Sequence, residues 1–355
     1  MSLRVVHWGT GSTGIHGLRA IIEHPDLDLV GLHVHSVDKI GRDAGELCGL
    51  PAVGVVGTDD LATTLALEAD CLSYMANGVG REPDAIADVV PFLERGSNVV
   101  TCSLIPFVFP PIAPREMADV LANACARGSS SFFNSGIDPG FATGQLVASL
   151  LALGTEVECV RVQELGNFSR YGAASIMREV FGFGQPSTFV PPLFTSGMLL
   201  HWWRGTIAEI ADLLGAQIDD VVLVHDVATV DHDVDCAFGR VEAGTVGAVR
   251  FELQGIHQGR PLVVVEHVDR ISLDAGPQWD RATTTGGTAY RLVVTGRPSY
   301  TCELGFSLAD GISGAVVSTA TYLVNAIGSV CAAPVGVLGV GDLPAFVGRR
   351  RRAET

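Results

Sequence analysis

The sequence has few positive charges, and outside one short C-terminal run they are not clustered. Its 355 residues include 23 Lys and Arg against 39 Asp and Glu, which gives a net charge of −16. The one basic run, 349–352, lies at the C-terminal end, where a frayed tail is favoured over a membrane or nucleic-acid anchor. Because nucleic-acid binding needs clustered Lys and Arg, the composition excludes a general nucleic-acid surface.

Paired cysteine motifs and long apolar runs are also missing. The eight cysteines form no C-x-x-C pair and most lie inside apolar runs, so reduced, buried thiols are favoured over disulfides or a zinc site. No stretch of 18 or more apolar residues reads as membrane-spanning, and no signal peptide precedes the first strand-like residues. We therefore expect a cytoplasmic protein that contacts neither membrane nor nucleic acid.

The first 140 residues alternate strand-like and helix-like segments, which is typical of right-handed βαβ units and a parallel sheet. The expected strands are 3–8, 27–35, 69–76, 98–102 and 129–136. Helices are expected between them, one of them with Thr58 as its N-cap and another kinked by Pro91. The fold class is therefore α/β, with a Rossmann-type parallel sheet in the first domain.

The composition changes after residue 140. A helix leads away at 141–154, and β-rich runs at 157–166 and 221–306 indicate a mainly antiparallel sheet with helices, including a hairpin that turns at Gly259. This predicts a second, α+β domain at 141–310, which binds substrate and mediates dimerisation. The apolar helix at 311–333 is expected to pack back, so that 311–355 completes the dinucleotide-binding domain of residues 1–140.

The strongest motif is GTGSTG, which follows the first strand and opens the first helix. In this context Gly9 permits a tight turn, Gly11 lets the backbone approach a diphosphate, and Gly14 lets helix and strand pack closely. The helix N-terminus then offers free N–H groups to the anion. The alternative is a glycine-rich turn without function. The expected cofactor contacts at this turn are Gly9, Thr10, Gly11, Ser12, Thr13 and Gly14.

The end of the second strand bears on the choice of cofactor. NAD-specific folds usually place an acid there, whereas this chain has His35 and Ser36, and Asp38 comes late. Ser36, Lys39 and Arg42 can donate to a 2′-phosphate, so NADP(H) is favoured. If Lys39 and Arg42 are ordinary solvated charges, NAD(H) is the alternative cofactor.

Several segments together resemble a known family. GTGSTG, HSVDKIGRDAGELCG, NVVTC, GIDPGF and VNAIGSVCAAP look like the 2,4-diaminopentanoate dehydrogenases and native amine dehydrogenases, with their dihydrodipicolinate-reductase-like N-terminal domain. The resemblance implies a two-domain NAD(P)-dependent enzyme, commonly a homodimer, that interconverts an amine with a ketone plus ammonia. Further cofactor contacts are then expected at Ala76, Asn77, Thr101, Cys102 and, from the returning helix, Asn325.

One position departs from that family. The resemblance implies a Glu directly after the TC of NVVTC, where it activates ammonia, but this chain has Ser103. A hydroxyl cannot replace a carboxylate as a base at neutral pH without help. The candidate catalytic residues are therefore Tyr171, which matches pocket tyrosines of the family, together with Glu164 and Ser103. For Tyr171 the alternative is a core or surface tyrosine, and for Glu164 an ion-paired strand residue.

Apolar and aromatic side chains gather at 104–109 and 168–203, which favours a small to medium, mainly apolar carbonyl, imine or amine substrate. Core packing or a dimer interface explains them equally well, and Asp138 can instead cap a helix. The run from His225 to Asp235 offers metal ligands, but a solvated strand face is favoured and no metal is expected. A non-catalytic NADP(H) sensor is the rival function. The expected pocket residues are Leu104, Phe107, Asp138, Phe141, Asn167 and Phe168.

Overall fold

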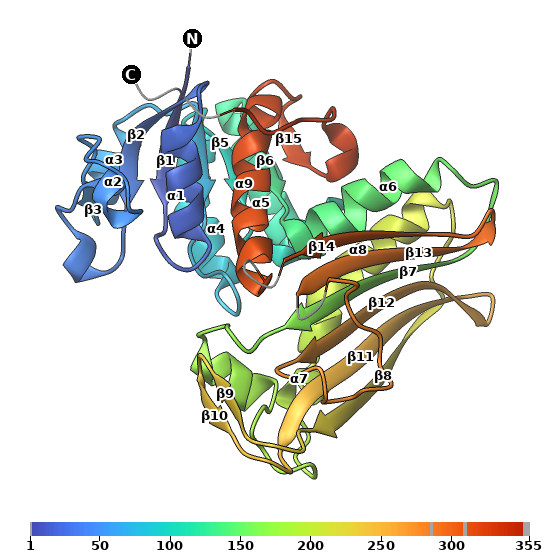
Figure 1. Ribbon diagram of the computed structural model, residues 1–355. Coiled ribbons are helices and arrows are strands. Elements are labelled where there is room, and N and C mark those ends of the chain that lie inside the picture. Colours follow the sequence, from blue (N-terminus) through green and yellow to red (C-terminus); the bar gives the residue numbers. More distant parts are fainter. Residues whose placement is uncertain (1, 285–286, 308–310, 351–355) are drawn as a thin grey trace. The chain divides into compact units, whose positions relative to one another are not determined.

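The computed structural model describes residues 2–284, 287–307 and 311–350. It divides the chain into two compact units, one of Met1–Phe141 with Val316–Thr355 and one of Ala142–Ala315. Each unit is built around its own β-sheet (Figure 1).

In the part of the chain that the structure describes, the first unit contains a seven-stranded parallel sheet with the order β15-β6-β5-β4-β1-β2-β3. All residues of β4 and β6 are buried, as expected when helices cover both faces of a parallel sheet. This confirms the predicted Rossmann-type fold. The strands are β1 (Leu3–Trp8), β2 (Leu27–His33), β3 (Gly57–Thr58), β4 (Cys71–Tyr74), β5 (Asn98–Thr101), β6 (Ser131–Asn134) and β15 (Gly336–Leu338).

Two apolar clusters form the core of this unit. One includes residues of α1 (Gly14–Glu23) and α9 (Gly311–Cys331), and the other includes residues of α4 (Glu82–Glu94) and α5 (Arg115–Gly128). Pro91 lies inside α4. The shorter helices of the unit are η1 (Val37–Lys39), α2 (Ala44–Leu47), α3 (Leu61–Leu65), η2 (Ile105–Phe107), η3 (Pro110–Ile112) and η6 (Val340–Asp342).

One local prediction is corrected. The N-cap of α3 is Asp60, whose carboxylate accepts from the N–H of Ala62 at 2.9 Å, whereas Thr58 is still in β3. Within the described residues, α9 is also long and apolar enough to cross a membrane by length and composition. However, several of its apolar residues, including Leu323, Val324 and Ile327, belong to the core cluster. This helix is therefore a core helix of the first unit.

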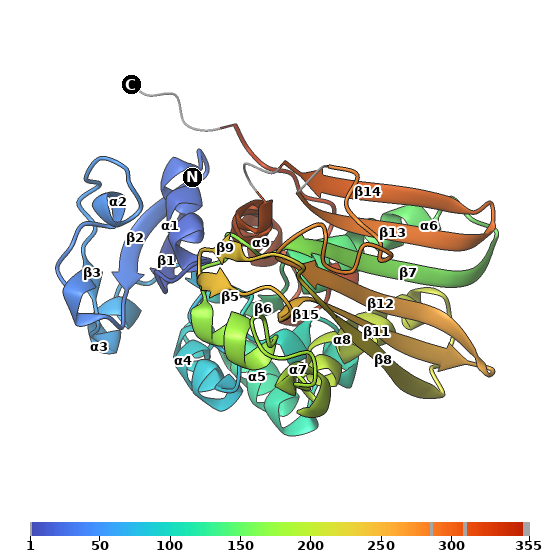
Figure 2. The same cartoon turned by 60° about the horizontal axis from the view of Figure 1, so that its bottom comes forward.

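Among its described residues, the second unit contains a six-stranded sheet with the order β14-β13-β7-β12-β11-β8, whose strands lie side by side in Figure 2. The pair β7–β12 is parallel and the other pairs are antiparallel, which confirms the predicted mainly antiparallel sheet. The hairpin between β11 and β12 turns at Gln258 and Gly259, both with positive φ, as predicted. The strands are β7 (Glu156–Asn167), β8 (Asp220–Thr229), β11 (Val246–His257), β12 (Arg260–Arg270), β13 (Thr288–Arg297) and β14 (Tyr300–Phe306).

Helix α8 (Met198–Leu213) packs on β11 and β12 and so defines the covered face of this sheet. The remaining elements are η4 (Ile137–Gln145), α6 (Leu146–Leu151), η5 (Ile176–Val180), α7 (Pro192–Thr195), and the hairpin of β9 (Val234–Cys236) and β10 (Gly239–Val241). Asp138, Pro139 and Gly140 have non-helical dihedral angles, so the helix predicted from residue 141 starts after a sharp bend.

Candidate active site

The glycine turn between β1 and α1 has the geometry that a dinucleotide requires. Gly9 has φ +106°, and a Cβ there would lie 2.7 Å from the carbonyl oxygen of Met75. A Cβ on Gly14 would lie 2.2 Å from the carbonyl oxygen of Gly9. By contrast, a Cβ on Gly11 would meet nothing within 4 Å. Packing therefore fixes the first and third glycines, while the second leaves open space at the start of α1, where a diphosphate can approach.

A buried histidine, His7, hydrogen-bonds to the backbone next to this glycine turn. His7 is fully buried; its Nε2 donates to the carbonyl oxygen of Gly14 at 2.8 Å, and its Nδ1 then accepts from the hydroxyl of Ser73 at 3.1 Å. Burial lowers the pKa of His7 to about 4, so the ring is neutral at physiological pH. His7 thus ties β1 and β4 to the first turn of α1. It was not predicted, because a lone histidine in a strand carries no motif.

At the end of β2 the structure places a lysine over the glycine turn. The Lys39 ammonium donates to the carbonyl oxygen and to the hydroxyl of Thr10, both at 3.0 Å. Ser36 and Arg42 are exposed nearby in sequence, and so is Asp38. The indole N–H of Trp8 donates to His35 at 3.0 Å. This strand end therefore presents donors and a cation and has no acid directly at its last residue.

The residues after β4 and β5 are held by backbone contacts. The hydroxyl of Ser103 donates to the carbonyl oxygen of Ala76 at 2.5 Å, and its N–H donates to the hydroxyl of Thr101 at 3.0 Å. Asn77 follows Ala76 and accepts from the N–H of Val79 at 3.3 Å. Ser103 is 6% exposed. Its hydroxyl is therefore committed to joining two strand ends, which argues against a role as base.

The side chains next to Ser103, at the end of β5, are also buried. Burial raises the pKa of Cys102 to about 11, so its thiol stays protonated. Leu104 and Phe107 are fully buried in the apolar core, where Phe107 packs against Phe132 with ring centroids 5.6 Å apart. The structure thus uses both predicted pocket residues, Leu104 and Phe107, to fill the core of the first unit.

Three further predicted residues lie along α9 or next to it. The N–H of Ile137, which precedes Asp138, donates to the hydroxyl of Thr319 at 3.2 Å. Phe141 packs against Tyr322, with ring centroids 5.5 Å apart. Asn325 lies further along the helix, with its amide against Gly348 of the C-terminal tail. Their roles in binding cofactor or substrate stay predictions.

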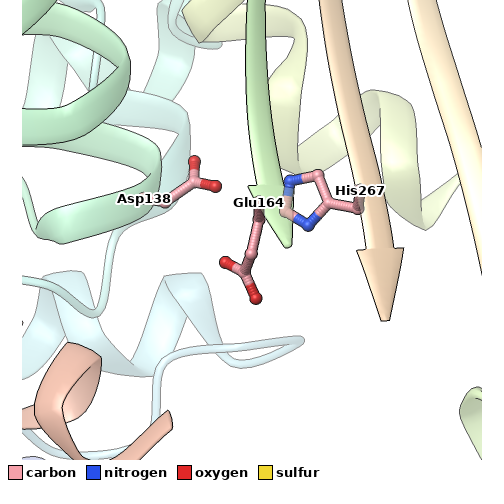
Figure 3. Close-up of side chains that lie close together, drawn as sticks. All are labelled: Asp138, Glu164 and His267. Atoms are coloured by element: carbon pink, nitrogen blue, oxygen red, sulfur yellow. The ribbon is translucent and has the colours of Figure 1, made fainter. Parts of the chain in front are cut away.

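The second unit brings an acid and an imidazole together. Glu164 near the end of β7 is in register with His267 on the parallel strand β12 (Figure 3). A carboxylate oxygen of Glu164 and a ring nitrogen of His267 lie within 4.8 Å of each other. Both side chains are buried, with 8% and 3% of their surface exposed. A carboxylate and an imidazole at this separation can hold and move protons.

Two aromatic rings contact His267. The His267 ring stacks on Phe251 with centroids 4.7 Å apart and meets Trp203 of α8 at 4.4 Å. Asp269 lies on the same face of β12 as His267, because side chains two residues apart in a strand point to the same side. Gly166 lies opposite Asp269 and leaves room for its carboxylate. The imidazole is therefore held in one orientation by flat apolar neighbours.

Tyr171 lies close to the carboxylate of Glu164. Burial, followed by the charge of Glu164, raises the pKa of Tyr171, so its phenol stays protonated at neutral pH. Its ring packs edge-on against Phe168 at 5.9 Å. Asn167 caps the end of β7 locally, because its side-chain oxygen accepts from the N–H and the hydroxyl of Ser169. The structure thus brings Tyr171, Glu164 and Phe168 together.

His267 and Asp269 were not predicted as site residues. They became visible only once the parallel pairing of β7 with β12 was known, and nothing local in the sequence marks that pairing. Trp203 belongs to the aromatic segment 168–203, for which a substrate pocket and core packing were both considered. The metal ligands considered at 225–235 are not on one strand, since β8 ends at Thr229 and β9 begins at Val234. Asp231, His232 and Asp274 do approach one another, but all three are exposed, as is common for acidic groups without an ion.

The parallel sheet, the glycine turn and the acid–imidazole pair define a class: dehydrogenases that use a nicotinamide dinucleotide. Residues 141–352 match the family model of the 2,4-diaminopentanoate dehydrogenase C-terminal domain. An amine dehydrogenase of Streptomyces virginiae is 35% identical over 346 residues, which cover 96% of each chain. This chain belongs to the amine dehydrogenase family and is an NAD(P)-dependent oxidoreductase of that type.

Solved structures show the same fold at lower identity. An amine dehydrogenase from Mycobacterium smegmatis superposes with a TM-score of 0.76 at 20% identity and covers 98% of both chains. A scyllo-inositol dehydrogenase from Lactobacillus casei, solved with bound NAD(H) and scyllo-inositol, has a TM-score of 0.53 at 13% identity over 92% of this chain and 89% of that one.

Proposed function

We propose that the enzyme catalyses reductive amination of a small to medium, mainly apolar ketone or aldehyde. In this reaction a carbonyl compound, ammonia, NADPH and a proton give an amine, NADP+ and water. The first unit binds the dinucleotide, which supplies the hydride, and the second binds the carbonyl compound. The observation that carries the proposal is the Glu164–His267 pair, because a chain with Ser103 at the expected position of the family's Glu needs another proton carrier.

The proton steps are assigned to side chains of the second unit. Glu164 takes a proton from ammonium, so that neutral ammonia can add to the carbonyl carbon. Tyr171, whose phenol stays protonated, donates a hydrogen bond to the carbonyl oxygen. His267 exchanges protons with Glu164, and the hydroxyl of the addition product leaves as water once it is protonated. Each general acid or base of this kind contributes about 10²–10⁴-fold to the rate.

The preference for an apolar substrate rests on the rings near the pair. Phe168 and Phe181 pack together at 5.7 Å, and Trp203 and Phe251 flank His267. Such surfaces favour alkyl or aryl groups over sugars, because polar hydroxyls would lose their hydrogen bonds to water there.

A substrate screen tests the reaction type. Purified enzyme, NADPH and a panel of ketones and aldehydes are mixed with and without ammonium, and NADPH absorbance is followed over time. We expect NADPH oxidation that requires ammonium and yields the amine by mass spectrometry. Oxidation that is independent of ammonium would identify a carbonyl reductase instead, and NADPH binding without any turnover would favour a sensor.

We also propose NADP(H) as the preferred cofactor. The support is the Lys39 ammonium over the glycine turn, with the exposed Ser36 and Arg42 available to a 2′-phosphate. A charge-assisted hydrogen bond to a phosphate contributes about 1.5–3 kcal/mol. Calorimetric titration with NADPH and NADH tests the preference, and tighter binding of NADH would overturn it.

We further propose a cytoplasmic homodimer. All eight cysteines are free, which suits a reducing compartment. On the face of the second sheet opposite α8, Arg161 and Arg250 pair with the buried Glu252 and Glu266, at 2.9 Å from Arg161 to Glu252 and 2.7 Å from Arg250 to Glu266. We propose that this surface of paired charges contacts the same surface of a second copy of the chain. Sedimentation of wild type and Arg250→Glu tests this, because a dimer through this face would dissociate in the variant and a monomeric wild type would refute it.

A further inference from the structure

Two cysteines of the first unit meet although 260 positions separate them in the sequence. Cys71 is the first residue of β4, and Cys331 is the last residue of α9. The Cys331 thiol donates to the carbonyl oxygen of Asp70, the residue before Cys71, at 3.8 Å. Cys71 belongs to the apolar core cluster of this unit, and Cys331 packs against the same cluster. The fold thus places the two cysteines next to each other.

The two thiols differ in exposure and acidity. Cys71 is fully buried, whereas Cys331 is partly exposed. The neighbouring Cys71 thiol lowers the pKa of Cys331 despite partial burial, while burial raises the pKa of Cys71. Among the described cysteines this downward shift stands apart, since burial raises the pKa of Cys125 and Cys236 to about 11. Cys331 therefore has the features of an attacking thiolate, with a resolving thiol beside it.

We propose that Cys71 and Cys331 are a redox modification site, which forms a reversible disulfide when the enzyme meets a peroxide. The Cys331 thiolate attacks one peroxide oxygen, the O–O bond breaks, and Cys331 becomes a sulfenic acid as the other oxygen leaves, with a proton, as water. The Cys71 sulfur then attacks the sulfenic sulfur, its proton leaves with the departing hydroxyl as a second water, and the S–S bond forms. Two thiols lose two electrons and two protons, which hydrogen peroxide takes up as it is reduced to two waters.

The bond would join the amino end of β4 to the carboxyl end of α9. In a parallel sheet the amino ends of the strands lie at the edge opposite the glycine turn, which follows the carboxyl end of β1. Oxidation is therefore expected to link α9 covalently to the sheet without blocking the glycine turn between β1 and α1. A cross-link that closes so long a loop restricts the unfolded chain and raises the melting temperature by several degrees.

The test exposes the purified full-length enzyme to a small excess of hydrogen peroxide. We expect a linked peptide pair containing Cys71 and Cys331 in non-reducing digests, a loss of two of the eight free thiols, and a melting temperature that rises and returns with dithiothreitol. Cys331→Ser should abolish all three effects, whereas the matched control Cys125→Ser should keep them.

Labelling of the wild-type enzyme provides a second measurement that needs no variant. Iodoacetamide should alkylate Cys331 at least tenfold faster than Cys125, and prior peroxide treatment should protect it. Equal labelling rates for these two cysteines would overturn the proposal. So would oxidation of Cys331 to sulfinic acid while Cys71 stays free.

Discussion

A buried carboxyl group in the second unit gives the sharpest test of the energetics. Glu209 lies on α8 with 8% of its surface exposed, and a Cβ added to Gly144 would lie 2.9 Å from its carboxylate oxygen. Burial raises the pKa of Glu209 from 4.5 to about 8, so the side chain is mostly neutral at pH 7 in the folded protein. We therefore expect Glu209→Gln, which keeps the shape and removes the titration, to stabilise the second unit at neutral pH.

The sign and size of this effect follow from the pKa. Between pH 4.5 and 8 the folded protein keeps a proton that the unfolded chain releases, so stability falls as pH rises. One pKa unit corresponds to about 1.4 kcal/mol, so the loss reaches about 3 kcal/mol at pH 7 and about 5 kcal/mol above pH 8. Below pH 4.5 the loss vanishes. Glu209→Gln should therefore be equal to wild type at pH 4 and more stable by about 3 kcal/mol at pH 7.

The assay is urea unfolding followed by tryptophan fluorescence at pH 4, 7 and 8.5. Three of the four tryptophans, Trp202, Trp203 and Trp279, lie in the second unit and so report its unfolding. The exposed Glu158→Gln is the matched control and should differ from wild type by less than about 0.5 kcal/mol at each pH. A stability difference between wild type and Glu209→Gln that does not change with pH would refute the reasoning.

Three further predictions concern the first unit. Burial lowers the pKa of His7 from 6.5 to about 4, so neutral His7 stabilises the folded protein fully above pH 6.5 and this stabilisation falls by about 3 kcal/mol as the pH drops to 4. In urea unfolding, His7→Gln should therefore reduce the loss of stability between pH 6.5 and 4. An unchanged loss would contradict this prediction. Gly14→Ala places a Cβ 2.2 Å from a backbone oxygen, so this variant should bind NADPH at least tenfold more weakly in calorimetry. Wild-type affinity for NADPH in this variant would show that the glycine turn does not bind the dinucleotide. Lys39→Ala should weaken NADPH binding about tenfold and NADH binding less, whereas equal losses would place Lys39 away from the 2′-phosphate.

Local patterns predicted the first unit well. The sequence predicts the glycine turn, the alternation of strands and helices, and the apolar helix near the C-terminus, because each of these features depends on neighbouring residues. β15 was not predicted, since a three-residue strand has no periodicity and pairs with β6 some 200 residues earlier. The sequence predicts Thr58 as the N-cap of α3, whereas the structure has Asp60 there. Both residue types cap helices, and only the strand boundary distinguishes the two positions.

The candidate site was predicted only in part, for a related reason. Glu164 and Tyr171 were found because they lie close together in the sequence, at and just after the end of β7, and because Tyr171 matches a tyrosine of the family. His267 belongs to a strand about 100 residues later whose register with β7 is set by the whole sheet. Ser103 and Leu104 stood out by sequence because an acid was expected there. Their burial and hydrogen bonds come from strand packing, which no local pattern reports.

The most direct test of the central claim is the kinetics of Glu164→Gln, with the exposed Glu158→Gln as control. Ketone, ammonium and NADPH are held at saturating levels while kcat is measured across pH, and the NADPH dissociation constant is measured by calorimetry. We predict that Glu164→Gln lowers kcat about 10²-fold or more and leaves NADPH affinity within about twofold, while the control matches wild type. A Glu164→Gln enzyme with wild-type kcat and an unchanged pH profile would contradict the assignment of Glu164 as the proton carrier.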